Sequence, residues 1–290
     1  MDVEYRKLSK IFNSSVLNDI AVGDFSYIQK VSEEFFSDCT TLNLSEIYQK
    51  SFEILQKHYP NEYVYKNLIA TKILLGRHSL NTATMLSEFR AGTNKADCVI
   101  LNGKSICYEI KTDYDSLVRL NDQLDAYTQI FDEVYVVCSK KHIDSVLKNV
   151  DSSIGVLNLS EKSTFQEIRK ANNPREKNKK LLIQSLRQSE YLELFEKLTG
   201  NKLVAPNTQL FDLCLDAMES FQDEKALNAF YIEILKKSRK NNKDFLTNMP
   251  TSLVNATISY KFSKSQILSL INNFNIKEEI HVLSNFKGKT

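Results

Sequence analysis

Three side chains that can together support metal-assisted chemistry lie close in the sequence: Asp97, Glu109 and Lys111. Asp97 precedes the apolar run 98–101 and Glu109 follows the run 106–108, and the Asn-Gly pair between the runs is typical of the turn of a β-hairpin. Two carboxylates on adjacent strands repel each other, so such a pair favours a cation between them. Lys111 shares a strand face with Glu109 and can offset developing negative charge or hold a water nucleophile.

The length of the hairpin turn determines whether the two acids can bind one cation. A two-residue loop would place Asp97 opposite Tyr108, and the carboxylates of Asp97 and Glu109 would then point to opposite faces of the sheet. A three-residue loop, 102–104, instead pairs Asp97 with Glu109 and needs one residue with a positive φ, which Gly103 adopts at little cost. We expect this second register, with the two carboxylates within about 5 Å of each other. The register also predicts an opposite, buried face made of Cys98, Ile100, Ile106, Tyr108 and Ile110.

Further polar residues flank this hairpin. Glu88 lies nine residues before Asp97. Residues 115–131 have the apolar spacing of an amphipathic helix, and Gln123 and Tyr127, four residues apart, share one of its faces. Ordinary structural roles are also open to these residues, Glu88 as an exposed helix acid and Tyr127 as a core aromatic. The acids and the lysine of the hairpin could likewise form an ion pair at a solvated sheet end.

Together these residues resemble the active-site signature of the PD-(D/E)xK superfamily of metal-dependent nucleases. The Glu-x-Lys of 109–111 and the Gln-x-x-x-Tyr of 123–127 resemble the RecB-type branch. The run 109–113 with Arg119 resembles a poorly characterised bacterial family of PD-(D/E)xK-like proteins more closely still. The resemblance covers roughly residues 80 to 140, and Ala96 stands where the family name has a proline.

The resemblance implies a catalytic role for each polar residue of the hairpin. Asp97 and Glu109 would be the principal metal ligands, the backbone carbonyl of Ile110 would add an oxygen, and Glu88 would hold a metal-bound water. Lys111 would offset charge in the transition state. Oxygen ligands without histidine or thiolate suit Mg²⁺ or Mn²⁺ better than zinc.

The resemblance also implies a substrate. Arg119, Gln123 and Tyr127 would orient a nucleic-acid strand, DNA more readily than RNA, in a nuclease that hydrolyses phosphodiester bonds. The source would be bacterial, with phage defence or a mobile element as the setting. Two alternatives remain open: a catalytically inactive nucleic-acid- or protein-binding module that keeps the nuclease fold, and a helical scaffold in which the α/β part is incidental.

The predicted elements follow the order of a restriction-endonuclease-like α-β-β-β-α-β core with a mixed sheet, which makes the fold class α/β. The helix at 115–131 would be a crossover, so the strand of Glu109 and the strand 134–138 should be parallel. A helix near 141–149, a strand at 154–157 and an edge strand near 165–168 would follow. We expect a helical N-terminal region at 1–60, the α/β core at 61–170, and a helical C-terminal region at 171–290 that begins with a polar linker to about residue 180.

Composition limits the remaining options. Net charge is only +2, but basic residues gather in 162–187 and again in 236–243, where they could follow a phosphate backbone or simply solvate helix faces. The five cysteines include no Cys-x-x-Cys and are expected to be buried in a reducing compartment. No leader-like apolar run follows the first residues, and no stretch reaches the ~18 apolar residues needed to span a bilayer. We therefore expect a cytoplasmic protein without a membrane partner, and we consider a homo-oligomer.

Overall fold

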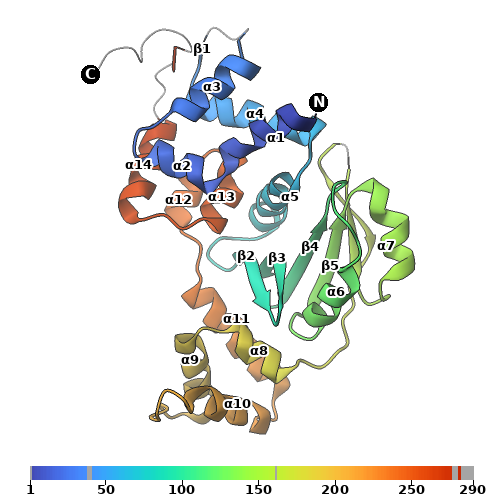
Figure 1. The fold of residues 1–290 in the computed structure, drawn as a ribbon. Coiled ribbons are helices and arrows are strands. Elements are labelled where there is room, and N and C mark those ends of the chain that lie inside the picture. Colours follow the sequence, from blue (N-terminus) through green and yellow to red (C-terminus); the bar gives the residue numbers. More distant parts are fainter. Residues whose placement is uncertain (1, 38–40, 161, 276–279, 282–290) are drawn as a thin grey trace. The chain divides into compact units, whose positions relative to one another are not determined.

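The protein was studied as a computed structural model that describes residues 2–37, 41–160, 162–275 and 280–281. Its chain folds into two compact units, one made of Met1–Thr71 with Asn242–Thr290 and the other of Lys72–Asn241 (Figure 1). These units divide the chain at other places than the three expected regions do. The expected N-terminal region shares one unit with only the last part of the expected C-terminal region, from Asn242 on, and residues 171–241 belong to the unit that holds the sheet.

The discontinuous unit is mainly helical. Its elements are α1 (Asp2–Ser9), η1 (Lys10–Phe12), α2 (Ser14–Ala21), α3 (Ser26–Phe35), β1 (Thr41–Leu42), α4 (Leu44–His58), α5 (Glu62–Leu68), α12 (Lys243–Asn248), η4 (Thr251–Leu253), α13 (Val254–Ser259), α14 (Lys264–Asn275) and β8 (Ile280–His281). A π-helix, η2 (Ile69–Leu75), contains the position where the chain passes from this unit into the other.

Buried polar and aromatic contacts join the two ends of the chain within this unit. The side-chain amide of Asn67 donates to the carbonyl of Thr251 at 2.9 Å, and its oxygen accepts from the N–H of Asn255 at 2.8 Å. The rings of Tyr48 and Phe274 meet edge to face with their centroids 5.1 Å apart. Because these contacts join residues about 200 positions apart in the chain, sequence periodicity does not predict them.

The continuous unit is an α/β structure built on a six-stranded mixed sheet in the order β2-β3-β4-β5-β6-β7. Its strands are β2 (Thr84–Ala91), β3 (Asn94–Leu101), β4 (Ser105–Lys111), β5 (Glu133–Cys138), β6 (Gly155–Leu159) and β7 (Phe165–Arg169). The strands from β2 to β4 are antiparallel neighbours, β4 to β6 are parallel, and β7 is an antiparallel edge strand. The parallel pairing of β4 with β5 confirms the expected crossover.

The helices of this unit are α6 (Leu120–Thr128), α7 (Ile143–Asn149), which follows η3 (Lys140–His142), α8 (Lys179–Ser185), α9 (Gln188–Thr199), α10 (Leu210–Ser220) and α11 (Glu224–Ser238). Helix α6 is shorter than the expected 115–131, because the carboxylate of Asp115 accepts from both the N–H and the hydroxyl of Thr112. Such local bonding competes with helix formation and keeps residues 112–119 in turns.

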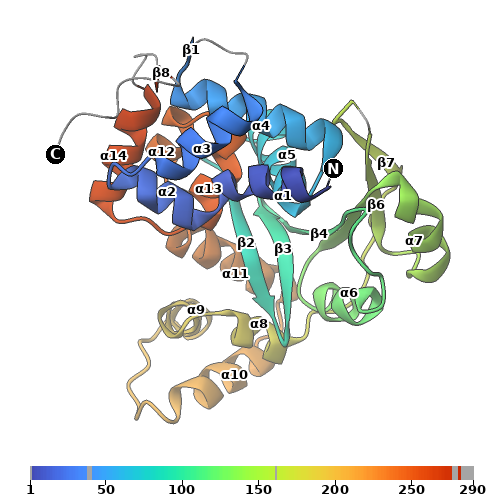
Figure 2. The ribbon, with the colours of Figure 1, turned by 45° about the horizontal axis from the view of Figure 1, so that its top comes forward.

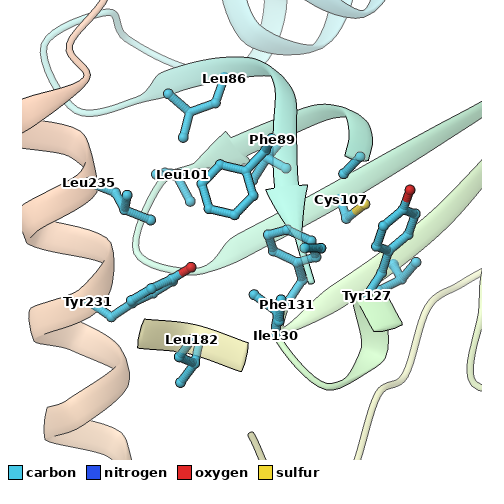
Figure 3. Packing of buried hydrophobic residues seen from close by; sticks show 14 of the residues in the cluster. Leu86, Phe89, Leu101, Cys107, Tyr127, Ile130, Phe131, Leu182, Tyr231 and Leu235 are labelled. Atoms are coloured by element: carbon cyan, nitrogen blue, oxygen red, sulfur yellow. The ribbon is translucent and has the colours of Figure 1, made fainter. Parts of the chain in front are cut away.

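One hydrophobic cluster joins the sheet, α6, α7 and the helices α8 to α11. Phe89 of β2 and Phe131 meet edge to face at 5.6 Å, and Tyr231 and Leu235 project from α11 into the same cluster (Figure 3). The predicted apolar stripe of α6 takes part, with Leu120, Leu124, Tyr127 and Phe131 buried and Leu117 packed against them. Residues 171–241 therefore complete the core of the sheet.

The segment predicted as a linker is held against the end of α6. The side-chain amide of Asn173 donates to the carbonyls of Thr128 and Phe131 at 2.8 and 2.9 Å, and Lys177 also donates to Phe131. Arg175 forms an ion pair with Asp125 at 2.7 Å. Several residues of the first basic cluster thus bind the carbonyls and acids of this unit, so they have structural partners of their own.

The edge strand β2 is closed by the last residues of the unit. The side chain of Asn241 accepts from the N–H of Met85 at 2.9 Å and donates to its carbonyl at 2.8 Å, as a neighbouring strand would. Two residues earlier, Arg239 stacks on Phe89 at 5.2 Å and forms a buried ion pair with Glu190 at 2.6 Å. These contacts fix the end of α11 beside the sheet.

Other expectations of the sequence have mixed outcomes. Cys98, Cys107, Cys138 and Cys214 are buried and are not disulfide-bonded, while Cys39 lies outside the described residues. In the described part of the chain, no helix has the length and apolar character needed to cross a membrane. Cytoplasmic location stays a prediction.

Replacing Glu190 with glutamine should lower the free energy of unfolding by a few kcal/mol, because the half-buried Arg239 would lose the counter-charge of the buried Glu190. Burial acts to raise the pKa of Glu190, but hydrogen bonds from Arg239, the backbone of Arg187 and Ser238 outweigh it and hold the pKa below 4.5. A group with a depressed pKa stabilises the fold above its unfolded pKa and loses that contribution as the pH falls through its folded pKa. Urea titrations should therefore show a constant difference in the free energy of unfolding between wild type and Glu190→Gln at pH values above the unfolded pKa. The difference should shrink as the pH falls through the lower, folded pKa.

The control is Glu193→Gln, whose partner Lys237 is largely exposed and whose ion pair should contribute about 0–1 kcal/mol. Equal losses in the two variants at neutral pH would refute the structural role assigned to the buried pair.

Candidate metal centre

The β3–β4 hairpin has the register that a shared acid site requires. Leu101 pairs with Ser105, and each earlier pair follows in step to Cys98 with Tyr108. Gly103 has φ +73°, and the N–H of Asn102 donates to the carbonyl of Lys104 at 3.0 Å across a three-residue loop. Both predictions about the turn are confirmed. Continued one step beyond the last paired residues, Cys98 and Tyr108, this register would set Asp97 opposite Glu109.

The β2–β3 hairpin extends this alignment to a third acid. Ser87 pairs with Cys98 and Phe89 with Ala96, so Glu88 lies opposite Asp97. A carboxylate oxygen of Glu88 and one of Asp97 come within 4.8 Å of each other. Glu88, Asp97 and Glu109 thus come from β2, β3 and β4, which are adjacent strands of the sheet (Figure 2). We call these three residues the acid row.

The backbone at Glu88 is strained. Its φ is +54°, a left-handed conformation that a residue with a Cβ adopts rarely and at a cost of about 1–3 kcal/mol. The alternation of side chains between the two faces of β2 is interrupted here. Leu86 and Phe89 are three residues apart and would face opposite sides of a regular strand, but both lie in the main cluster. The strand turns its faces at Glu88, where regular pairing with β3 is interrupted.

Asp97 lies where β3 and β4 separate. The ladder between them ends at Cys98 and Tyr108, although both strands continue. The carboxylate of Asp97 accepts from the N–H of Ile110 at 2.7 Å, in place of a backbone acceptor. This hydrogen bond fixes a half-buried carboxylate next to Glu109. The metal-ligand role expected for the carbonyl of Ile110, and the 5 Å separation expected for the two carboxylates, stay predictions.

Glu109 is the most buried member of the acid row, with 1% of its surface exposed. The ammonium group of Lys111 lies 2.7 Å from its Oε1 and donates also to the side-chain oxygen of Gln123 at 3.1 Å. Among the described residues, no hydrogen-bond partner is found for its buried Oε2. Burial raises the pKa of Glu109, and Lys111 opposes this rise most strongly, followed by Tyr127 and Gln123.

The donors of the acid row fit a hard divalent cation. A buried carboxylate oxygen without a partner is costly, and a cation that meets it removes that cost. The row offers carboxylate oxygens only, which suits Mg²⁺ or Mn²⁺. The ion-pair alternative also holds in part, because Lys111 does bind Glu109. That pair lies in the sheet interior, however, and leaves half of the carboxylate unsatisfied.

The residues of the following helix have unequal positions. Gln123 is half-buried and contacts Lys111, so it belongs to the site. Tyr127 is fully buried, and its hydroxyl donates to the carbonyl of Lys95 at 2.7 Å. It is the core aromatic that the sequence left as an alternative, and its burial excludes direct stacking on a substrate. Arg119 is exposed at the start of α6, and no hydrogen bond or ion pair between described residues joins its side chain to the acid row.

The predicted buried face of the hairpin is confirmed except at Ile106, but it is not the only buried face of the described hairpin. Cys98, Ile100, Tyr108 and Ile110 are buried as expected, and Ile106 is half-buried. The face of the acids is also buried, since Val99, Leu101 and Cys107 lie in the main cluster beneath α6. The acid row is thus at the margin of an apolar layer covered by helix, which explains why Glu109 and Lys111 are nearly inaccessible.

Sequence reasoning missed the residues that hold the turn after Lys111. Asp115 accepts from the N–H of Thr112 at 2.8 Å, and the ring Nε2 of His142 lies 3.0 Å from the Thr112 carbonyl. These contacts fix the chain directly beyond Lys111. The Thr-x-x-Asp spacing was a signal for the first contact, since short polar side chains bond to nearby backbone in turns. Nothing local indicated the second.

Comparison with known proteins places the chain in a family. The family described as bacteriophage P4 protein cII matches residues 55–281. The chain belongs to this family. Protein cII of Enterobacteria phage P4 is 28% identical over 176 residues, which cover 59% of this chain and 65% of that protein, just under two thirds of its length. The match to the cII family includes the whole acid row.

A solved structure, the SPO1766 protein of unknown function from Silicibacter pomeroyi, is similar at 15% identity. It covers 41% of this chain and 82% of that chain with a TM-score of 0.28. A similarity at this score supports no argument about fold or function.

Millimolar Mn²⁺ or Mg²⁺ should raise the melting temperature, because a cation bound only by the native state adds about 2.7 kcal/mol at a hundred times its dissociation constant. Glu88→Gly should stabilise the cation-free protein by about 1 kcal/mol, because relief of the left-handed strain exceeds the added chain entropy of glycine. The same variant should weaken the response to cations. Thermal melts with and without Mn²⁺ measure both effects.

Ser163→Gly is the matched control, since Ser163 has φ +55° and lies outside the acid row. It should keep the full response to Mn²⁺. An unchanged cation response in Glu88→Gly would remove Glu88 from the metal centre.

Proposed function

We propose that the protein is a metal-dependent nuclease that hydrolyses phosphodiester bonds in nucleic acid, on a restriction-endonuclease-like core. The observation that carries the proposal is the acid row of Glu88, Asp97 and Glu109, with the buried Oε2 of Glu109, for which the described residues supply no hydrogen-bond partner, beside Lys111. The order of elements supports it, since a helix, three antiparallel strands, a crossover helix and a parallel strand follow one another.

The residues present divide the chemistry among them. A bound Mg²⁺ or Mn²⁺ would supply charge to polarise a phosphate oxygen and lower the pKa of a water. Asp97, held by the N–H of Ile110, and Glu109 would bind the cation, and Glu88 would hold a water at the exposed end of the row. Lys111 is positioned by Glu109 and Gln123, so its ammonium group can stabilise negative charge developing on the phosphate.

The family supports a proposal about the biological setting in which the protein acts. The relative is a phage protein, so we propose that the nuclease acts in a phage or mobile element, with DNA as its substrate. The role expected for Arg119 in binding that substrate is retained, because its side chain is exposed. The role expected for Tyr127 passes to positioning, through its place beneath the hairpin.

Asp97→Asn should reduce cleavage of plasmid or single-stranded DNA at least 100-fold, because one metal ligand loses its charge. The measurement is single-turnover cleavage with Mg²⁺, Mn²⁺ or EDTA, with tRNA as a second substrate. Asp122→Asn is the control, since it removes an exposed acid from α6. Purified wild-type protein that binds DNA but cleaves none of these substrates with either cation would favour the inactive binding module.

Lys111 is less suited to this test than its position in the motif suggests. The sequence alone predicts that Lys111→Ala folds normally and loses only activity. In the structure Lys111 is 8% exposed and bound to the buried Glu109, so its removal should also destabilise the fold by a few kcal/mol. Activity of this variant must therefore be measured below its melting temperature.

A further inference from the structure

Two basic side chains oppose each other next to the acid row. Arg90 of β2 pairs directly with Lys95 of β3, and both residues are exposed. Directly opposed side chains of a cross-strand pair lie about 4.5–5.5 Å apart at Cβ, where like charges destabilise the pairing. A sheet that keeps two positive charges in this position favours an anion between them.

Neither side chain is neutralised within the part of the chain that the structure describes. No ion pair involves Arg90 or Lys95 there, whereas many basic residues of the same unit have acidic partners. The Nε of Arg90 donates to the carbonyl of Gly92 at 3.2 Å, which restrains the guanidinium group. The backbone of Lys95 is restrained by the hydroxyl of the buried Tyr127.

The pair also has a defined distance from the acid row. Arg90 follows Glu88 by two residues on β2, and Lys95 precedes Asp97 by two on β3. Two residues of strand span about 7 Å. Arginine and lysine together supply directed and mobile donors for a phosphate group. The hairpin thus carries a strip of positive charge that begins beside the acids.

We propose that Arg90 and Lys95 bind a backbone phosphate of the nucleic acid next to the phosphate placed at the acid row. This inference rests on the proposed function for the identity of the ligand. It adds a binding determinant that acts through charge. Tyr127 supports it from the core, because its hydroxyl holds the strand that presents Lys95.

The test is equilibrium binding of labelled single-stranded and duplex DNA in EDTA, where cleavage is absent. Lys95→Glu should lower affinity about tenfold near 0.1 M salt. The slope of log affinity against log salt should become shallower by about 0.9 for duplex or about 0.7 for a single strand. The same variant should raise the melting temperature, because an opposed pair of unlike charge replaces the repulsive one.

Lys148→Glu is the matched control, since it makes the same charge change at an exposed position of α7. Lys95→Gln, which removes charge without reversing it, gives an intermediate result if the proposal holds. Equal losses of affinity in Lys95→Glu and Lys148→Glu would overturn the proposal. Displacement of labelled DNA from the wild type by free phosphate but not by unlabelled DNA would also overturn it. Loss of binding in Lys95→Glu with no cleavage by wild type would sustain this inference and refute the nuclease.

Discussion

The burial of Glu109 is the constraint on which the site depends. A carboxylate enclosed between apolar strands and a covering helix must find compensating charge, and Lys111 supplies it on one side only. The second oxygen has no hydrogen-bond partner in the described structure. The two acids that the sheet aligns with Glu109 add more negative charge instead of relieving it. The proposed cation would resolve this conflict, and the proposed chemistry depends on it.

Strand pairing and hydrophobic packing hold the residues of the acid row in place. Two antiparallel registers set Glu88, Asp97 and Glu109 in line, and the cluster beneath α6 keeps the strands from slipping. The helices after the sheet complete that cluster, with Arg239 and Asn241 closing the exposed edge of β2. The strain at Glu88 shows where the surrounding structure overrides local preference, as it often does at functional sites.

Local chemistry allowed much of the site to be predicted. The requirement that Asp97 and Glu109 share one face selected the three-residue loop that the structure has, and a crossover helix required β4 and β5 to be parallel. The left-handed conformation of Glu88 was not predictable, because it depends on the packing of Leu86 and Phe89 in one cluster. The division of the chain into units was missed for the same reason. Asn67 and Thr251 lie too far apart in sequence for any local pattern to join them.

The segment after the sheet illustrates a second limit. Polar residues and Pro174 predicted a linker, but hydrogen bonds to the end of α6 make it part of the unit. Its positive charges satisfy helix carbonyls and acids, so composition alone overstated their availability to a phosphate backbone. A basic side chain can be judged available to a phosphate only when its partners are known. Arg175 forms an ion pair with Asp125, whereas Arg90 donates to the carbonyl of Gly92.

The central claim is that a divalent cation binds between Asp97 and Glu109. Crystals grown or soaked in Mn²⁺ and measured for anomalous scattering test it most directly. The account predicts one strong anomalous peak in coordination distance of the Glu109 Oε2 and of an Asp97 oxygen, about 2.0–2.3 Å from each. A peak at another site, or Oε2 of Glu109 bonded to a protein donor in an ordered, Mn²⁺-soaked crystal, would contradict it.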